Sequence, residues 1–357
     1  MTRASCIRLE GVTKTYPAAS APAVADLSLD VAPGEILALL GPSGCGKTTT
    51  LRLIAGFETP DTGRIVVGGR VVDDDRVHLP PEQRGIGFVF QDYALFPHLT
   101  VRDNIAFGLR RMPKAERAAR VRTVIELCEL EGMEGRFPHE LSGGQQQRTA
   151  LARAMAPGAE VVLLDEPLAS LDPEIRATLR GEIRRTLKQA GKTVILVTHD
   201  QEEAFEIADR VGVLDHGRLV QIGTPEEIFY APATRFVALF VGQANFVPGL
   251  VDGESIDTEV GRLANEPGLA PGTPVDVMLR PSNVHLEADP NGPGIVTARV
   301  FHGSERVYTV RLPSGLELRA SLPSTSALAE GTRVAVIARP THVVAFGRGQ
   351  ARGRSSP

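Results

Sequence analysis

A single glycine-rich loop constrains the fold of this chain more than any other feature. Residues 41–48 read Gly-Pro-Ser-Gly-Cys-Gly-Lys-Thr and match the pattern G-x-x-x-x-G-K-[ST] of phosphate-binding loops. An apolar run at residues 35–40 predicts a buried strand before the loop, and a helix is expected from about residue 47 to 56. In this order, backbone N–H groups and the positive end of a helix dipole surround a phosphate. The loop therefore predicts a P-loop protein that binds a nucleoside triphosphate.

The side chains of this loop have separate expected roles. Lys47 should reach the β- and γ-phosphates, and the Thr48 hydroxyl should ligate Mg²⁺. The glycines let the backbone amides turn inward around the phosphate oxygens. The loop alone leaves kinases, GTPases and motor proteins open. The predicted ATP ligands in this region are Gly41, Ser43, Gly44, Cys45, Gly46, Lys47, Thr48 and Thr49.

Strand and helix patterns alternate through the first part of the chain. Apolar runs at 161–164 and 193–197 predict strands that are buried on both faces. Helices are expected at 113–131, 173–189 and 201–208, and a hairpin closed by His216 and Gly217 is expected at 211–221. This alternation predicts an α/β fold with a largely parallel sheet.

The pattern changes after about residue 242. Short β-rich runs are separated by Gly and Pro clusters, which predicts a small β-barrel. The residues after 346 are mostly Gly, Arg and Ser, so the segment 347–357 is expected to be a disordered tail. The strands of the barrel are predicted at 275–279, 295–301, 307–312, 316–320, 334–337 and 343–346.

Length and composition fit a two-domain protein of the cytoplasm. The chain has 357 residues and a net charge of −4 at pH 7, so nothing indicates nucleic-acid binding. No stretch approaches the roughly 18 consecutive apolar residues of a membrane-spanning helix, and the first residues lack the apolar core of a signal peptide. Cys6, Cys45 and Cys128 are odd in number and far apart, which is not a disulfide framework.

A second anion-binding pattern occurs at residues 141–148, Leu-Ser-Gly-Gly-Gln-Gln-Gln-Arg. Ser142 followed by Gly143 and Gly144 predicts the start of a helix, whose free amides attract a phosphate. The loop at 41–48 already provides this site for the chain's own nucleotide. The simplest interpretation is that the second site contacts a nucleotide held by another copy of the chain.

Two adjacent carboxylates end the buried strand predicted at 161–164. The carboxyl ends of strands in an α/β sheet form the edge where ligands bind. Asp165 should hold Mg²⁺ through water, and Glu166 should orient or deprotonate the attacking water.

These motifs resemble those of the ABC ATPases, and the pattern at 141–148 resembles the signature that defines that family. The resemblance covers about residues 5 to 235 and implies further roles. Tyr16 would stack on adenine, and His199 would contact the γ-phosphate. Gln91 would contact Mg²⁺ or the lytic water and couple the ATPase to its membrane partner. Asp172 would lie at the dimer seam; just before it, this chain has Ala-Ser where the family often has Ser-Ala.

The resemblance also implies a domain organisation. Residues 1–242 would form the ABC ATPase domain, with a helical subdomain at about 92–156. Residues 243–346 resemble the OB-like TOBE barrel of importer ATPases, with the run Leu-Arg-Pro-Ser-Asn-Val at 279–284 as the best marker.

The implied assembly is a head-to-tail homodimer that holds two ATP molecules. Each nucleotide would lie between the 41–49 loop of one copy and Ser142, Gly143, Gly144 and Gln145 of the other. Membrane permease subunits would be the direct partners, and an extracytoplasmic solute-binding protein an indirect one. The chain would then work at the cytoplasmic face of the inner membrane.

The sequence constrains the cargo less than the chemistry. Residues 79–84 and 136–140 resemble ferric-iron importers, and polyamine importers for spermidine or putrescine share much of the same sequence. Ferric iron is therefore the expected cargo and a polyamine the alternative. An ABC ATPase outside transport is a second class, although such proteins typically carry coiled-coil insertions or tandem ATPase domains.

Overall fold

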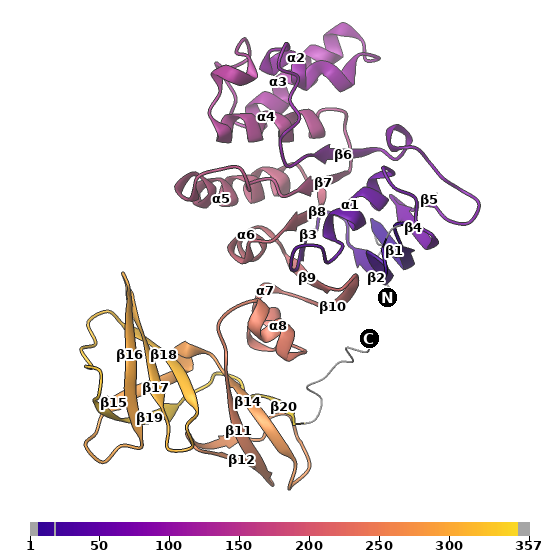
Figure 1. The fold of residues 1–357 in the computed structure, drawn as a ribbon. Coiled ribbons are helices and arrows are strands. Elements are labelled where there is room, and N and C mark those ends of the chain that lie inside the picture. Colours follow the sequence, from indigo (N-terminus) through magenta and orange to yellow (C-terminus); the bar gives the residue numbers. More distant parts are fainter. Residues whose placement is uncertain (1–5, 18, 349–357) are drawn as a thin grey trace. The chain divides into compact units, whose positions relative to one another are not determined.

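The computed structural model describes residues 6–17 and 19–348. By packing, the chain divides into two compact units, Met1–Pro225 and Glu226–Pro357 (Figure 1). Across the described ranges, none of the helices is long and apolar enough to span a bilayer.

The first unit is built on a six-stranded sheet in the order β10-β9-β3-β8-β7-β6. Strands β9, β3, β8, β7 and β6 are parallel to their neighbours, and β10 pairs antiparallel with β9 at the edge. All residues of β3, β7 and β8 are buried, which confirms the buried strands predicted there. The bounds are β3 Ile36–Leu40, β6 Ile86–Val89, β7 Val161–Asp165, β8 Thr193–Thr198, β9 Arg210–Asp215 and β10 Arg218–Gly223.

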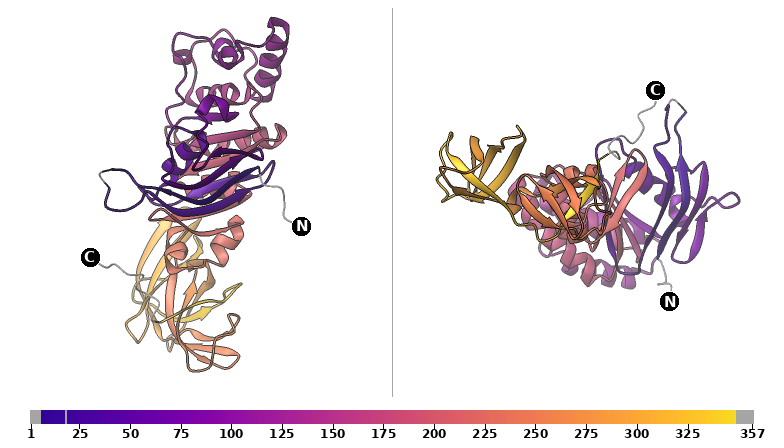
Figure 2. Two further views of the ribbon diagram at one scale, coloured as in Figure 1. Left: turned by 90° about the vertical axis from the view of Figure 1, so that its right-hand side faces the viewer. Right: turned by 90° about the horizontal axis from the view of Figure 1, so that it is seen from below.

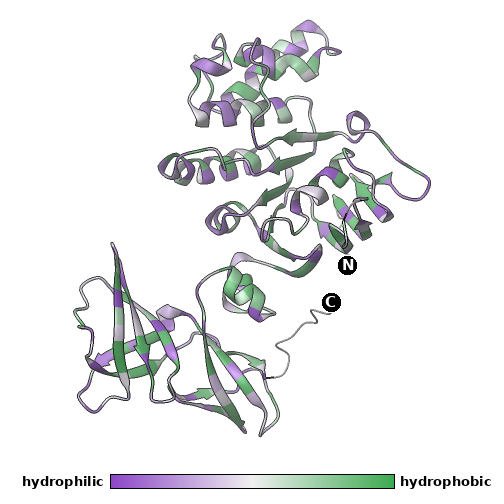
Figure 3. Cartoon of the chain, in the orientation of Figure 1, coloured by the Kyte–Doolittle hydropathy of each residue, from purple (hydrophilic) through white to green (hydrophobic). Residues whose placement is uncertain are grey.

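Helices follow several of these strands in the chain. They are α1 Lys47–Ala55, α5 Pro173–Gln189 and α6 Gln201–Ile207. Figure 3 shows the strands of the sheet mostly in the hydrophobic colour and α5 in mixed colours, as expected for a helix with one buried face. The β9–β10 turn contains His216 and Gly217 with φ of 44° and 77°. Such mirror-image turns match the twist of a hairpin, and the predicted hairpin is confirmed.

A second, antiparallel sheet belongs to the same unit, with the order β2-β1-β4-β5. Its buried side chains share one hydrophobic cluster with α1 and with residues of β3, β7 and β8. The strands are β1 Ile7–Lys14, β2 Val24–Val31, β4 Thr62–Val67 and β5 Arg70–Asp73.

A helical layer lies between β6 and β7 in the chain and forms one end of the first unit in Figures 1 and 2. Its last helix packs on β6, since a Cβ on Gly87 would lie 2.4 Å from the carbonyl oxygen of Ala154. The predicted helix at 113–131 ends earlier, at Leu127, because Glu129 adopts a left-handed φ of 53° just after the C-cap. The elements of this layer are α2 Val101–Ala106, η2 Phe107–Leu109, α3 Lys114–Leu127, η3 Pro138–Glu140 and α4 Gly143–Met155, whereas η1 Pro81–Gln83 precedes β6.

In the region predicted as a small β-barrel, the second unit contains two five-stranded antiparallel sheets, β13-β12-β11-β14-β20 and β15-β19-β16-β17-β18. Both contribute to a single hydrophobic cluster. The elements are α7 Pro225–Tyr230, α8 Arg235–Phe240, β11 Asn245–Asp252, β12 Ser255–Thr258, β13 Gly261–Ala264, β14 Pro274–Leu279, η4 Pro281–Asn283, β15 Val284–Ala288, β16 Gly294–His302, β17 Glu305–Arg311, β18 Glu317–Pro323, β19 Arg333–Ala338 and β20 Val344–Gly347.

The division by packing falls earlier than the domain boundary predicted after residue 242. The reason is Arg280, a buried residue of the 279–284 run. Its guanidinium donates to the carbonyls of Phe229 (2.7 Å), Ala238 (2.7 Å) and Gln243 (3.1 Å), which ties α7 and α8 to the second unit. The domain limits at 242 and 347 stay predictions. Residues 349–357 of the expected tail lie outside the described residues, and Gly347 belongs to β20.

Candidate active site

The loop between β3 and α1 has the geometry of a phosphate cradle. Gly46 is the N-cap of α1 with a φ of 101°, and a Cβ there would lie 2.1 Å from the carbonyl oxygen of Ala23. Only glycine fits this position, because both the space and the dihedral exclude a side chain. No side chain caps the helix, so the first amides of α1 have no side-chain partner. Amides in this position bind anions.

Lys47 is folded onto its own loop. The side chain is buried, and Nζ donates to the carbonyl oxygens of Gly41 (2.7 Å) and Pro42 (3.0 Å). The Cys45 sulfur lies 3.8 Å from the same nitrogen. An ammonium group has three N–H donors, and the third faces the Cys45 sulfur, a weak acceptor that a phosphate oxygen could replace. The ammonium is thereby fixed within the cradle.

Tyr16 lies in the segment that follows β1. Its ring is half-buried, and Lys14 Nζ lies 5.8 Å from the ring centroid. The chain comes back to the end of β1 at Ala23, whose amide donates to the carbonyl of Lys14. The carbonyl oxygen of Ala23 lies against Gly46. The predicted adenine-stacking residue therefore lies on a segment that adjoins the phosphate loop.

Thr48 and Asp165 meet at the expected metal position. The Thr48 hydroxyl donates to Asp165 Oδ1 at 3.2 Å, and Asp165 is the last residue of β7. Burial raises the pKa of Asp165 above its ordinary range, opposed by the hydrogen bond from Thr48. A bound divalent cation would offset this penalty on the ionised form.

The donor set fits Mg²⁺. A hydroxyl and a carboxylate are hard oxygen ligands, and Mg²⁺ typically takes one or two carboxylates and completes its shell with water and substrate phosphates. Among the described residues, no three His, Cys, Asp or Glu side chains gather into a metal site. The protein ligands present thus suit a cation shared with a nucleotide.

Glu166 is held beside His199. Its Oε2 lies 3.2 Å from His199 Nδ1, and its amide donates to the carbonyl of Val197 at 2.9 Å. Its φ of 44° is left-handed, a conformation that costs a non-glycine residue on the order of 1–3 kcal/mol. His199 follows β8 and Glu166 follows β7, so neighbouring parallel strands bring the two together. A carboxylate next to an imidazole can accept a proton from water and keep a donor close by.

Gln91 lies at the same edge of the sheet. It follows β6, which pairs with β7 through Val89 and Leu164, and its side chain is exposed. Neighbouring strand ends therefore carry Gln91, the Asp165–Glu166 pair and His199.

The signature residues form a separate site. The Ser142 hydroxyl accepts from the Gln145 amide (3.4 Å), and Gln145 Oε1 accepts from the Ser142 amide (3.0 Å), which caps α4. A Cβ on Gly143 would lie 2.5 Å from Leu171, and one on Gly144 would lie 3.1 Å from Leu179. A cleft of about 440 Å³ opens here between α4 and α5.

The structure does not bring this signature site to the phosphate loop of the same chain. Figure 1 shows α4 separated from α1 by β6 and β7. Asp172, the predicted seam residue, is the exposed N-cap of α5 and lies next to Leu171. Within one chain the 41–48 loop and the signature helix start are therefore two separate surfaces.

Sequence reasoning missed three charged residues around these loops. Arg153 donates to backbone carbonyls of the Gln91 segment, and Arg176 donates to Asp200 (3.2 Å) and to the Leu171 carbonyl (3.0 Å). Glu203 is buried and accepts a hydrogen bond from Thr198. Each follows a motif within one to three helical turns, which is the only sequence signal that could have singled them out.

Two family models match the chain. The model described as "ABC transporter" matches residues 24–169, and the model described as "TOBE domain" matches residues 277–346.

Curated relatives match over most of their length. A spermidine/putrescine import ATP-binding protein of Marinobacter nauticus is 44% identical over 83% of this chain and 82% of its own. A sulfate/thiosulfate import ATP-binding protein of Thermosynechococcus vestitus is 45% identical over 88% and 90%, respectively. A putrescine transport ATP-binding protein of Escherichia coli is 42% identical over 88% and 87%. None of these three names mentions iron, so the expected ferric-iron cargo finds no support.

A solved structure matches the first part of the chain. It is a dimeric ATP-binding cassette in a post-hydrolysis state with ADP and Pi, with a TM-score of 0.53 and 32% identity over 61% of this chain and 98% of the other. This match agrees with the predicted P-loop fold.

Proposed function

Because this chain belongs to the ABC transporter family as an import ATP-binding subunit, we propose that it powers the uptake of polyamines such as spermidine and putrescine. It is an ATPase, and the observation that carries its chemistry is the Glu166–His199 pair beside the Thr48–Asp165 contact. The phosphate cradle at 41–48 serves that chemistry.

The proposed hydrolysis uses groups that are already in position. Mg²⁺, held by Thr48 and Asp165, would neutralise charge on the phosphates. The N–H of Lys47 that faces the Cys45 sulfur would donate to a γ-phosphate oxygen. Glu166 would accept a proton from the attacking water, and His199 would hydrogen-bond the γ-phosphate. Catalysis then consists mostly of positioning and charge stabilisation.

The nucleotide site is proposed to be shared by two copies. The phosphate loop of one copy and Ser142, Gly144 and Gln145 of the other would enclose one ATP. The separation of α4 from α1 within the chain supports this arrangement, as does the dimeric state of the related ATP-binding cassette.

The transport partners are proposed to be permease subunits at the cytoplasmic face of the membrane, with a solute-binding protein on the other side. The word "import" in the names of the relatives supports this role. Gln91 would respond to the permease, since its side chain is exposed at the edge that carries Asp165 and Glu166.

Polyamine cargo replaces the ferric iron that residues 79–84 and 136–140 suggested. Polyamine names occur repeatedly among the relatives, which supports this choice. Sulfate or thiosulfate is the second candidate, because the relative of that name is equally similar and is covered over 90% of its length.

Uptake in a strain that lacks the gene tests the cargo. Initial rates would be measured for radiolabelled spermidine, putrescine and sulfate, with complementation by the wild type and by Lys47→Ala as the matched inactive control. We expect polyamine uptake to fall and to return only with the wild type. Loss of sulfate uptake alone would favour the second candidate, and unchanged uptake of all three would exclude both.

A further inference from the structure

Two active-site segments that lie far apart in the sequence are joined by one side-chain hydrogen bond. The Gln segment, residues 90–96, contains Gln91, and the Asp segment, residues 167–172, contains Asp172. The Ser170 hydroxyl donates to the Tyr93 phenolic oxygen at 2.9 Å. Tyr93 is buried, whereas Ser170 is exposed.

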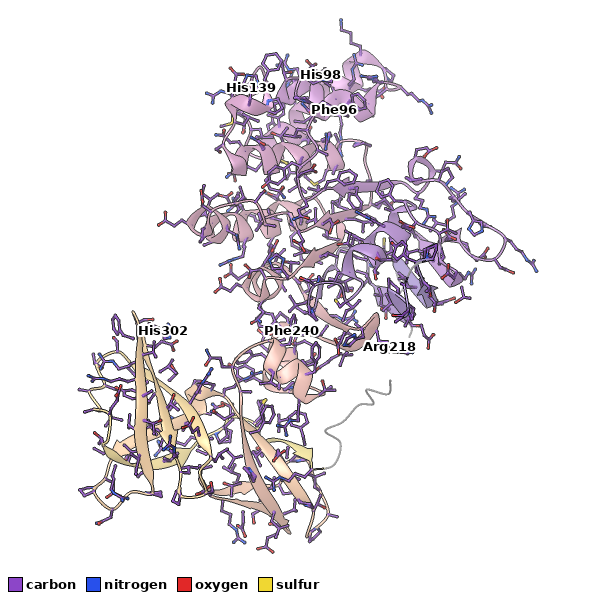
Figure 4. All side chains as sticks on the ribbon, in the orientation of Figure 1. Phe96, His98, His139, Arg218, Phe240 and His302 are labelled. Carbon is purple, nitrogen blue, oxygen red and sulfur yellow. The ribbon has the colours of Figure 1, made fainter. Side chains whose placement is uncertain are left out.

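The Gln segment is held in an unusual conformation. Tyr93 and Ala94 have left-handed φ values of 62° and 44°, which are uncommon for non-glycine residues. Arg153 of α4 donates to both of their carbonyls, at 2.8 and 2.6 Å. Its guanidinium lies 5.3 Å from the centroid of the ring of Phe96, a residue labelled in Figure 4. The backbone that carries Gln91 is thus fixed from the α4 side, and the Tyr93 side chain is free to contact a second element.

The Asp segment is bonded to two other parts of the site. Leu171 lies against Gly143 of the signature, where an added Cβ would meet it at 2.5 Å. Arg176 donates to the Leu171 carbonyl and also to Asp200, the residue after His199. A displacement of the Asp segment would therefore also change the contacts of the signature helix and of the segment that carries His199.

We propose that the Tyr93–Ser170 hydrogen bond is a positioning link between Gln91 and Asp172, so that movement of one segment is carried into the other during the ATPase cycle. The link rests on the proposed function, since it gives the Gln segment a role in hydrolysis. The link also gives a reason for the order Ala169–Ser170. In this chain the hydroxyl lies one residue later than in the Ser-Ala pattern of the family, and at that position it contacts Tyr93. Both residues act through others, and neither is placed in contact with the nucleotide.

The test compares variants of the full chain in a MgATP hydrolysis assay. Tyr93→Phe and Ser170→Ala each remove the bond, and Ser170→Thr keeps the hydroxyl. Tyr308→Phe is the matched control, because Tyr308 is a buried tyrosine of the second unit whose phenol donates to the Ser326 carbonyl at 2.8 Å. The kcat, the KM for ATP and the melting temperature are measured for each variant.

We expect each bond-removing variant to lower kcat about fivefold, with a KM within about twofold of the wild type. That factor corresponds to the usual net contribution of one hydrogen bond, about 1 kcal/mol. The double variant should be no slower than the slower single variant, because the same bond is lost once. Ser170→Thr should recover most of the rate. Tyr308→Phe should lower only the melting temperature.

Three results would overturn the link: wild-type kcat in both single variants, additive losses in the double variant, or a fall in kcat in Tyr308→Phe equal to that in Tyr93→Phe. The last result would mean that lost stability alone explains the effect. Failure of the proposed polyamine uptake is distinguishable, because it would appear in the uptake assay and would leave MgATP hydrolysis by the wild-type chain unchanged.

Discussion

Glu203 is the residue at the active site whose ionisation is most affected by its surroundings. It lies in the first turn of α6, four residues after His199, and is only 2% exposed. Burial raises its pKa from 4.5 to about 7, although a hydrogen bond from Thr198 opposes the shift. Asp200 and Glu166 raise the pKa further, and Arg176 lowers it.

This shift predicts a pH-dependent stability. Because the folded-state pKa lies above the unfolded value, the carboxyl's contribution is complete below pH 4.5 and is lost as pH rises through about 7. The melting temperature of Glu203→Gln, relative to wild type, should therefore increase between pH 5 and pH 8, by roughly 2–4 °C per kcal/mol. Thermal melts across this range measure the trend. Glu202→Gln, whose side chain is 74% exposed, is the matched control. A pH-independent difference for Glu203→Gln would contradict the assignment.

Cys45 predicts a slow, pH-dependent inactivation. Its side chain is 3% exposed and burial raises its pKa, with Lys47 opposing the shift. Since the thiolate is the nucleophile, alkylation should be slow at pH 7 and faster above pH 9. An adduct in the phosphate loop should abolish ATP hydrolysis, and prior ATP should protect. Peptide mass spectrometry must assign the label, because Cys6 and Cys128 are also buried. Full activity after stoichiometric labelling of Cys45 would refute the prediction.

Residue roles could be predicted from the sequence only where the chemistry is local. The 41–48 loop carries its glycines, lysine and threonine in one short pattern, so its phosphate site was evident. The Tyr93–Ser170 bond joins residues 77 positions apart, and it exists because β6 and β7 pair in the folded chain. A pattern within one segment contains no information about such a contact. Glu203 could not be singled out for the same reason, since its pKa depends on burial.

At the scale of the elements, the sequence predicted those with strong periodicity and missed several short ones. β7 and β8 are wholly apolar because both faces of the sheet are covered, which made them evident. The strand Gly261–Ala264 buries only Leu263, so it carries no alternation that a sequence could reveal. Helices α7 and α8 have six residues each, too few for a helical period.

The position of Arg280 predicts where the chain can be cut. A chain ending at residue 242 keeps α7 and α8 but loses Arg280, which leaves the carbonyls of Phe229 and Ala238 without their donor. A chain ending at Pro225 keeps all strands of the six-stranded sheet and loses both helices. We expect both to bind ATP, because every proposed phosphate contact lies earlier, and the longer chain to melt at a lower temperature. Fluorescent-nucleotide binding and thermal melts measure this. A folded 1–225 chain that fails to bind ATP would contradict the domain division.

At the scale of the whole molecule, catalysis and assembly are expected to depend on the same nucleotide. The catalytic carboxylate can be tested without disturbing binding. Glu166→Gln keeps the shape and the hydrogen bonds of the side chain but removes its basicity. General-base steps contribute a factor of about 10² to 10⁴, so turnover should fall by that amount. ATP affinity should be retained, because Lys47 and Thr48 are unchanged. Phosphate release and equilibrium nucleotide binding are the measurements, and wild-type turnover would show that Glu166 is not the base.

The same variant tests whether two chains complete each ATP site. With hydrolysis blocked, ATP should hold two copies together, since each nucleotide would join the 41–48 loop of one chain to Ser142 and Gly144 of the other. Glu166→Gln should therefore elute as a dimer with ATP and mostly as a monomer without it.

Adding Ser142→Arg should abolish the ATP-dependent dimer, because the long side chain occupies the helix start that faces the phosphate. Ser142→Ala is the control: it removes only the α4 cap, a loss of about 1 kcal/mol, and should weaken the dimer without abolishing it. The second unit could associate on its own, so the change caused by ATP is the quantity to compare. If Glu166→Gln binds ATP and never dimerises, even with its permease present, each ATP site must be complete within one chain, and the separation of α4 from α1 would need another explanation.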